Sequence, residues 1–337
     1  MLTIHQVRTT IVSHVKRLKT FTILAICLLL ISAGCVTPSP TPEAPTPPQT
    51  PAPEEIPTAP TPTPTPAPAP TAPTDTGELK IHFIDVGQGD AILIDFGETE
   101  ILIDGGDKSS GIVSYLNDYV DGCLEVIVAT HPHADHIGGL ISVLGSFEVE
   151  EIWHNGDSTI SKTYSEFTAA VQSEGADIHV GKRGDVINVG TLQFTILNPA
   201  TLNGTTNNNS LVLSLSYGNI DFLFTGDAEK EAEADMLVSS VVAVLDVEIL
   251  KVGHHGSNTA CSNEFIAAAK PEIAVYMAGE DNRYGHPHEG TIRVLCDVGA
   301  QIYGTDIHGS IVITSDGEDY EIQLEKPAPS VKLATEG

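Results

Sequence analysis

Proline is distributed very unevenly along this chain of 337 residues, and that distribution limits where a fold can form. Sixteen of the 22 prolines lie between Pro38 and Pro73. Proline fixes its own φ angle and lacks the amide hydrogen that a helix or a sheet ladder needs. The other residues there are mostly threonine and alanine, which bury too little apolar surface to offset the entropy lost on ordering. We therefore expect residues 35–77 to be a disordered, polyproline-like linker.

The segment before this linker, residues 1–34, has the pattern of an export signal. Basic residues precede an apolar run over 21–31, which is too short to span a bilayer but is typical of a signal sequence. Small residues then end at Cys35 and resemble a lipobox, although Ser32 stands where leucine is usual. We expect cleavage before Cys35, a lipid on its sulfur, and a body tethered to the outer face of the cell membrane. The alternative is an uncleaved membrane anchor.

The remaining residues form one acidic body, which we place at 78–326, followed by a C-terminal tail at 327–337. The chain carries 16 Lys and Arg against 45 Asp and Glu, a formal net charge of −29. Such a charge repels polyanions, so we expect no strong non-specific binding to nucleic acid. A body of roughly 250 residues can bury a sizeable core as a single domain. These features leave the oligomeric state open.

Apolar runs predict a layered α/β fold with large mixed sheets. The run at 124–129 is short and continuous, as expected for a strand that is covered on both faces. Strands occur at both ends of the body with helices between them, which is typical of layered folds. Strands are predicted at 79–86, 91–96, 100–104, 124–129, 149–153, 192–197, 210–217, 221–225, 247–252, 273–277 and 310–314. Helices are predicted at 111–119, 137–144, 164–173, 228–239, 264–269 and 291–297.

The strongest functional signal is the sequence HPHADH at 131–136, just after the buried strand predicted at 124–129. His131 and His133 alternate along an extended segment and can point the same way. Asp135 and His136 lie at the predicted start of the next helix, so they project from a different direction. One strand-to-helix loop can therefore serve two adjacent cations. Imidazole and carboxylate ligands suit zinc and also manganese or iron.

Further polar residues follow predicted strands later in the chain. Asp227 lies in DFLFTGDAE, His254 and His255 are adjacent in KVGHHGSN, and His286 and His288 lie in YGHPHEG. Loops at strand ends are where α/β folds place reacting groups. Taken singly, Asp227 could be a helix N-cap and the histidines could be ordinary polar loop residues. Taken together, these residues favour a metal site.

These motifs resemble those of the metallo-β-lactamase superfamily, whose signature is matched by HPHADH, TGD and HHGS. A longer series is similar to the extracellular domain of the DNA-uptake competence proteins called ComEC. That series is HFIDVGQGDAILI, the turn Asp104-Gly105-Gly106, NNNSLVLSLSYG, FLFTGDAE, LKVGHHGS and YGHPH. The resemblance covers roughly residues 79–314. It implies an αββα sandwich with metal ions at one edge, between the two sheets.

The resemblance also implies two divalent ions, most simply zinc, with manganese as the alternative. The implied metal ligands are His131, His133, Asp135, His136, Asp227 and His254. The first two would bind one ion, Asp135 and His136 would bind the other, and Asp227 would bridge both. The sequence does not decide between His254 and His255 as the last ligand. We favour His254, which is nearer the strand end, and expect His255 to reach the substrate.

One departure from the superfamily pattern affects the first ion. Many members supply a further histidine upstream of the TGD strand, whereas residues 206–210 of this chain read TNNNS. The first site is therefore expected to be poorer in imidazole, and to bind metal more weakly or to prefer manganese. The asparagine run is either an ordinary turn or part of the site.

The expected activity is hydrolysis by a hydroxide that bridges the two metals. Two cations about 3.5–4 Å apart lower the pKa of a shared water to about 7 and polarise the substrate oxygen. The expected catalytic residues are Asp135, which would orient the water, and His255 and His286, which would contact the substrate or the leaving group. The competence resemblance favours a phosphodiester substrate, and so a nuclease or phosphodiesterase. The alternatives are hydrolysis of a lactam, lactone or other acyl substrate, and a non-enzymatic metal- or ligand-binding lipoprotein.

Overall fold

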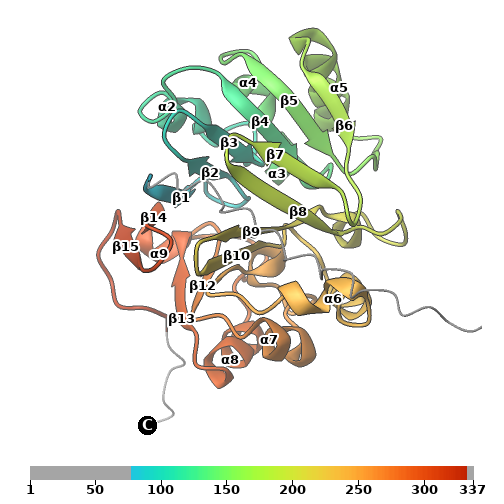
Figure 1. Ribbon diagram of the computed structural model, residues 1–337. Helices are drawn as coiled ribbons and strands as arrows, with labels where there is room; N and C mark the ends of the chain where they lie inside the picture. Colours follow the sequence, from blue (N-terminus) through green and yellow to red (C-terminus); the bar gives the residue numbers. More distant parts are fainter. Residues whose placement is uncertain (1–76, 332–337) are drawn as a thin grey trace, which may run out of the picture. The chain divides into compact units, whose positions relative to one another are not determined.

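Two β-sheets face each other at the centre of residues 77–331, the part of the chain that the computed structural model describes (Figure 1). Helices cover the outer faces of both sheets. This arrangement confirms the predicted α/β class and its two-sheet sandwich. The expected signal segment, the lipid site at Cys35, nearly all of the expected linker and residues 332–337 lie outside the described residues.

The first sheet has eight strands in the order β15-β14-β1-β2-β3-β4-β5-β6. These strands are β1 (Leu79–Phe83), β2 (Ile92–Asp95), β3 (Glu100–Ile103), β4 (Leu124–Ala129), β5 (Val149–His154), β6 (Asp177–Val180), β14 (Ile311–Ser315) and β15 (Tyr320–Leu324). Strands β3 to β6 run parallel to one another, whereas the others pair antiparallel. The carboxyl ends of β3 and β4 therefore meet at one edge of the sheet, where the loop at 131–136 begins.

The second sheet has seven strands in the order β13-β12-β11-β10-β9-β8-β7. These strands are β7 (Val186–Val189), β8 (Leu192–Asn198), β9 (Val212–Tyr217), β10 (Ile220–Phe224), β11 (Ile249–Lys251), β12 (Ile273–Tyr276) and β13 (Gln301–Gly304). Strands β10 to β13 are parallel. Asp227 follows the carboxyl end of β10, and His254 and His255 follow the carboxyl end of β11.

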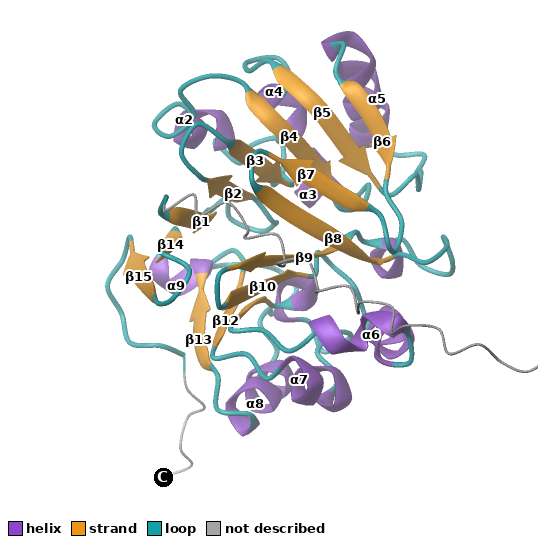
Figure 2. Cartoon of the chain, viewed as in Figure 1, coloured by secondary structure: helices purple, strands orange, loops and turns teal. Residues whose placement is uncertain are grey.

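Helices lie outside each sheet (Figure 2). Those packed near the first sheet are α2 (Ile112–Leu116), α3 (Ala134–Ile137), α4 (Leu140–Val143) and α5 (Lys162–Glu174). Those of the second half are α6 (Lys230–Leu237), α7 (Asn263–Ala269), α8 (Glu289–Asp297) and α9 (Thr305–His308), with short 3-10 helices η1 (Asn207–Asn209), η2 (Ser240–Val244) and η3 (Gly253–Gly256). Within residues 77–331, none of these helices has the length and apolar character needed to cross a membrane.

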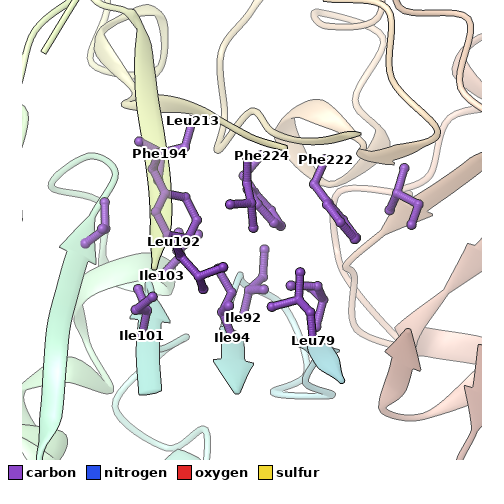
Figure 3. Close-up of a cluster of buried hydrophobic side chains, with 14 of the residues drawn as sticks. Leu79, Ile92, Ile94, Ile101, Ile103, Leu192, Phe194, Leu213, Phe222 and Phe224 are labelled. Atoms are coloured by element: carbon purple, nitrogen blue, oxygen red, sulfur yellow. The ribbon is translucent and has the colours of Figure 1, made fainter. Parts of the chain in front are cut away.

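Apolar side chains from the facing sides of the two sheets form the central core (Figure 3). Along β1, Leu79, Ile81 and Phe83 alternate into this core, as the two-residue period of a strand requires. Phe222 and Phe224 do the same from β10 and are almost completely buried. The core holds the two sheets in a fixed relation, and so fixes the edge at which their loops meet.

The helix expected at 137–144 is interrupted, because α3 ends at Ile137 and α4 begins at Leu140. Gly138 and Gly139 lie between them. A Cβ atom at Gly139 would clash with the backbone carbonyl of Gly105, so only glycine allows this close approach. Strands β6, β7, β13 and β15 were not predicted, since much of their surface is exposed and their apolar pattern is weak.

Replacing Phe222 by alanine tests the central core. We expect Phe222→Ala to lower the free energy of unfolding by about 3–5 kcal/mol, because it leaves a cavity between the sheets. Urea denaturation with a chelator present in every sample measures this change. The control is Ile160→Ala, whose side chain is fully exposed and should change stability by no more than about 0.5 kcal/mol. A loss below about 1 kcal/mol for Phe222→Ala would contradict the described packing.

Candidate metal centre

Histidines and carboxylates from both sheets meet at the carboxyl ends of β4, β10 and β11. Two groups of ligand atoms each lie within 4.8 Å of one another. The groups are His131, His133 and Asp227, and Asp90, His136, Asp227 and His255. All of these residues except His133 are buried. The structure therefore brings Asp227 and His255 to the loop at 131–136, and Asp227 belongs to both groups.

Several atoms at the centre of this cluster lack partners. The Nε2 atoms of His136 and His255 and the Oδ1 atom of Asp227 are buried, with no hydrogen-bond partner among the described residues. The two nitrogens lie 3.2 and 3.4 Å from Oδ2 of Asp227, but without the alignment of a hydrogen bond. Unpaired buried polar atoms are rare and destabilising, and an ion removes that penalty. Imidazole nitrogens and carboxylate oxygens together fit a divalent cation.

Asp104 orients His136. The Asp104 carboxylate accepts hydrogen bonds from the amide and the hydroxyl of Thr130, at 2.8 and 2.6 Å. Its Oδ2 atom also lies 2.7 Å from Nδ1 of His136, which therefore carries the proton. The other ring nitrogen, Nε2, is directed at Asp227. Such outer carboxylates fix the tautomer and the ring orientation of metal-binding histidines.

His255 is oriented in a similar way from the other sheet. Its Nδ1 lies 2.9 Å from the carbonyl oxygen of Met277 and 3.2 Å from Oδ1 of Asp90. A carbonyl can only accept, so Nδ1 is the donor and Nε2 is left facing Asp227 and Asp135. Asp90 itself is paired with Lys251, whose buried ammonium lies 2.5 Å from Oδ2.

His254 occupies a different position from His255. Its side chain is 22% exposed, and its Nε2 lies 3.8 Å from Oδ2 of Asp227. Its Nδ1 lies 2.9 Å from the Thr259 hydroxyl and 3.1 Å from Glu229. We expected His254 to complete the second group and His255 to reach the substrate. The geometry favours the opposite assignment, because His255 alone of the pair belongs to the buried group.

The remaining expected site residues line an open pocket with about 700 Å³ of empty space. Asp135 lies there, with its side chain 30% exposed and its Oδ2 3.5 Å from Nε2 of His255. His286 and Asn207 line the same pocket, and Nδ1 of His286 is buried without a partner among the described residues. His288, in contrast, accepts a hydrogen bond from the amide of Asn258 and so serves the local structure.

The side chains of the site differ in their charge at neutral pH, because their surroundings shift their pKa values differently. Burial opposes ionisation of Asp135, but the nearby imidazoles of His255 and His136 outweigh it and hold the pKa of Asp135 well below its usual range. Burial and the neighbouring histidines lower the pKa of His286 to about 4. Burial, with His136 beside it, also holds the pKa of His131 well below its usual range. At neutral pH, Asp135 is a carboxylate, whereas His131 and His286 are neutral.

Asp90, Asp104 and Lys251 were not expected as parts of the site. Asp104 follows β3 in a left-handed conformation, with φ 57°, before two glycines. Asp90 follows the glycine-rich turn at 87–89. Each of these aspartates lies beside glycines and next to an apolar strand, Asp90 before β2 and Asp104 after β3, and this pattern could have identified both. Nothing in the local sequence shows which histidine each of them contacts.

Comparison with known proteins gives a family and several relatives. Residues 84–280 match the family model described as "Metallo-beta-lactamase superfamily". The chain is 30% identical over 260 residues to "ComE operon protein 3" of Bacillus subtilis. That alignment covers 71% of this chain and 33% of the relative. It is 29% identical over 253 residues to "Recombination protein 2" of Haemophilus influenzae, with 72% and 30% covered. The chain thus spans about a third of the length of these relatives.

The chain is also similar to a solved structure. The metallo-beta-lactamase fold protein YhfI from Bacillus subtilis is 15% identical to this chain, with a TM-score of 0.49. The alignment covers 71% of this chain and 100% of that one.

Replacing Asp104 by asparagine tests the orientation of His136. We expect Asp104→Asn to weaken binding of Zn²⁺ or Mn²⁺ by about 10- to 100-fold, because His136 loses its charged hydrogen-bond acceptor. Competition with a chromophoric chelator measures the affinity without any assay of activity. The control is Asp246→Asn, which removes an exposed carboxylate paired with Lys270. Equal metal affinity in the wild-type protein and Asp104→Asn would contradict this role.

Proposed function

The chain belongs to the metallo-β-lactamase superfamily, as its motifs indicated, and from that membership we propose that it is a metal-dependent hydrolase of phosphodiester bonds. The observation that carries the proposal is the position of Asp227. Its carboxylate is common to both groups of ligand atoms, so a single side chain can join two cations. The unpartnered nitrogens of His136 and His255 support the same arrangement.

Two divalent ions are proposed, held by residues from both sheets. The proposed ligands of the first are His131, His133 and Asp227, and those of the second are Asp135, His136, Asp227 and His255. When bound, such a pair of ions lowers the pKa of a water between them and polarises the substrate oxygen. The second set has four ligands, two imidazoles and two carboxylates, and suits zinc. The first set has three ligands, with no added histidine from residues 206–210, so manganese is the alternative there.

The protein side chains then position the reactants. Asp135 is a carboxylate at neutral pH and lines the pocket, so it can accept a hydrogen bond from the attacking water. His286 is neutral, because burial and its neighbours lower its pKa to about 4. It therefore contributes a hydrogen bond to the substrate rather than protonating the leaving group. His255 serves the cation in this scheme and not the substrate.

A phosphodiester is favoured over an acyl substrate for one reason. One relative is named "Recombination protein 2", and the sequence motifs resemble those of DNA-uptake competence proteins, so both point to nucleic acid. A nucleic acid strand is a poor match for a chain of net charge −29, however, because like charges repel. The substrate that reconciles both observations is a short phosphodiester. Hydrolysis of a lactam or lactone by the same residues is the alternative.

Turnover of a chromogenic phosphodiester tests this function. We expect hydrolysis of bis(p-nitrophenyl) phosphate when zinc or manganese is added. His133→Ala should lower the rate by about 100-fold or more, because the loss of even an outer partner of a metal site costs about 10- to 100-fold. The control is His179→Ala, which removes a histidine on β6 that stacks on Trp153 outside the pocket.

Three outcomes would contradict the proposed phosphodiester hydrolysis. Hydrolysis of nitrocefin or of a lactone without phosphodiester hydrolysis would assign the acyl activity instead. Tight metal binding with no hydrolysis of either class would leave a non-enzymatic metal-binding protein. A rate for His133→Ala equal to that of the wild-type protein would remove the first group of ligands from the reaction.

We further propose that the domain at 78–326 is exported and tethered through a lipid on Cys35, with residues 35–77 as the spacer. The support is the sequence pattern at 1–35. In a bacterial host that processes lipoproteins, a fatty-acid label should enter the wild-type protein and be lost in Cys35→Ala, with the domain released from membranes. Cys123→Ala is the matched control and should keep the label. Equal labelling of Cys35→Ala and the wild-type protein would contradict the anchor.

A further inference from the structure

The loop between β12 and α8 forms one wall of the pocket, and the proposed function uses only His286 from this loop. Tyr284 and His286 line the pocket that contains Asp135. A second hollow, with about 1010 Å³ of empty space, is lined by Arg283 and also shares Gln88, Asp135 and Tyr284 with the first. The two hollows are therefore adjacent, and one ligand can extend from the metal ligands into the second.

Planar side chains on this loop form a stack that leads toward the metal ligands. The guanidinium of Arg283 lies over the ring of Tyr284, 4.9 Å from its centroid, and donates a hydrogen bond to its hydroxyl. The ring of Tyr284 stacks on that of His286 at 5.5 Å and 19°. The ring of His286 in turn stacks on that of His255 at 6.1 Å and 27°. A planar group bound beside Arg283 would therefore continue this stack.

Asn282 fixes the loop that carries these side chains. Its Oδ1 accepts hydrogen bonds from the amides of Tyr284 and His286, at 3.2 and 2.9 Å. Its Nδ2 donates to the carbonyl oxygens of Gly279 and His286, at 2.8 and 2.7 Å. The stack is thus presented in advance of binding, which reduces the entropy lost when a ligand binds.

Gln88 offers an unused donor beside the same hollows. Its Oε1 accepts a hydrogen bond from the amide of Gly279 at 3.4 Å, which orients the side-chain amide. Its Nε2 is buried and has no partner among residues 77–331. A buried donor without an acceptor is destabilising, so a ligand oxygen at this position would be favoured.

Charge limits the kind of ligand that fits. Asp107, Asp135 and Asp281 line the second hollow, and Arg283 is its one Lys or Arg side chain among the described residues. A long polyanion would place further phosphates beside these carboxylates and be repelled. A ligand with a single phosphodiester needs only one cation.

We propose that Gln88, Arg283 and Tyr284 form a recognition subsite for a short nucleotide phosphodiester. Gln88 and the edge of the Arg283 guanidinium bind non-bridging phosphoryl oxygens. The nucleobase packs against the outer face of the guanidinium, which is itself stacked on Tyr284. This assignment rests on the proposed phosphodiester hydrolysis and adds to it a substrate class.

Two esters with the same leaving group test the subsite. These are thymidine 5′-(p-nitrophenyl phosphate) and methyl p-nitrophenyl phosphate, which differ only in the nucleoside. We expect the wild-type protein to have a KM about tenfold lower for the thymidine ester, since stacking of one base is worth about tenfold or more. Tyr284→Leu should abolish this preference, and Arg283→Gln should raise KM for both esters. The matched control is Arg293→Gln, an exposed arginine on α8 that pairs with Glu289.

Binding provides a readout that needs no turnover. Calorimetry with the metal-loaded protein should show thymidine 5′-monophosphate binding about tenfold more tightly than inorganic phosphate. The difference should vanish in Tyr284→Leu and persist in Arg293→Gln. Circular dichroism checks that each variant is folded.

The outcomes separate this inference from the proposed function. The protein could hydrolyse phosphodiesters while Tyr284→Leu and Arg283→Gln have the same KM values and nucleotide affinity as Arg293→Gln. That result would overturn the subsite and leave the proposed function standing. The protein could instead bind nucleotide without hydrolysing phosphodiesters, with both variants weakening that binding. That result would support the subsite and count against the proposed function. A 20-nucleotide strand that binds more than about tenfold tighter than the monophosphate would overturn the assignment of a short substrate.

Discussion

Burial of several carboxylates at one edge of the sandwich is the constraint on which the site depends. Asp90, Asp104 and Asp227 are each no more than 2% exposed. A buried carboxylate is costly unless charged or hydrogen-bonding partners compensate it. Lys251 compensates Asp90, and Thr130 with His136 compensates Asp104. Within residues 77–331 the ion-pair partners of Asp227 are all imidazoles, and Asp90 is close as well, so the position of Asp227 is the one that most requires a cation.

The sequence was most informative where potential metal ligands come directly after a recognisable strand. The loop at 131–136 directly follows a continuous apolar strand, so both the strand β4 and the ligand cluster could be recognised from the same stretch. Asp227 and the histidine pair also follow strands, which is why they could be expected at the same edge. Edge strands such as β6 and β15 escaped prediction, because their side chains face solvent on one or both sides.

What could not be predicted is which of two neighbouring side chains enters the cluster. His254 and His255 both have left-handed backbones, with φ of 46° and 55°. That turn sends one imidazole to the carbonyl of Met277 and the other to Glu229. The partners come from elements distant in the chain, so no local pattern encodes the choice. The contacts of Asp90 and Asp104 are equally non-local.

The division of the ligand residues between two sheets has a mechanical consequence. Residues 131–136 leave the first sheet, whereas Asp227 and His255 leave the second. Any cation held by ligands from both sheets would link the two layers at this edge, in addition to the apolar core between them. Folding and ion binding would then be linked, and the stability of the sandwich would rise with the concentration of free metal.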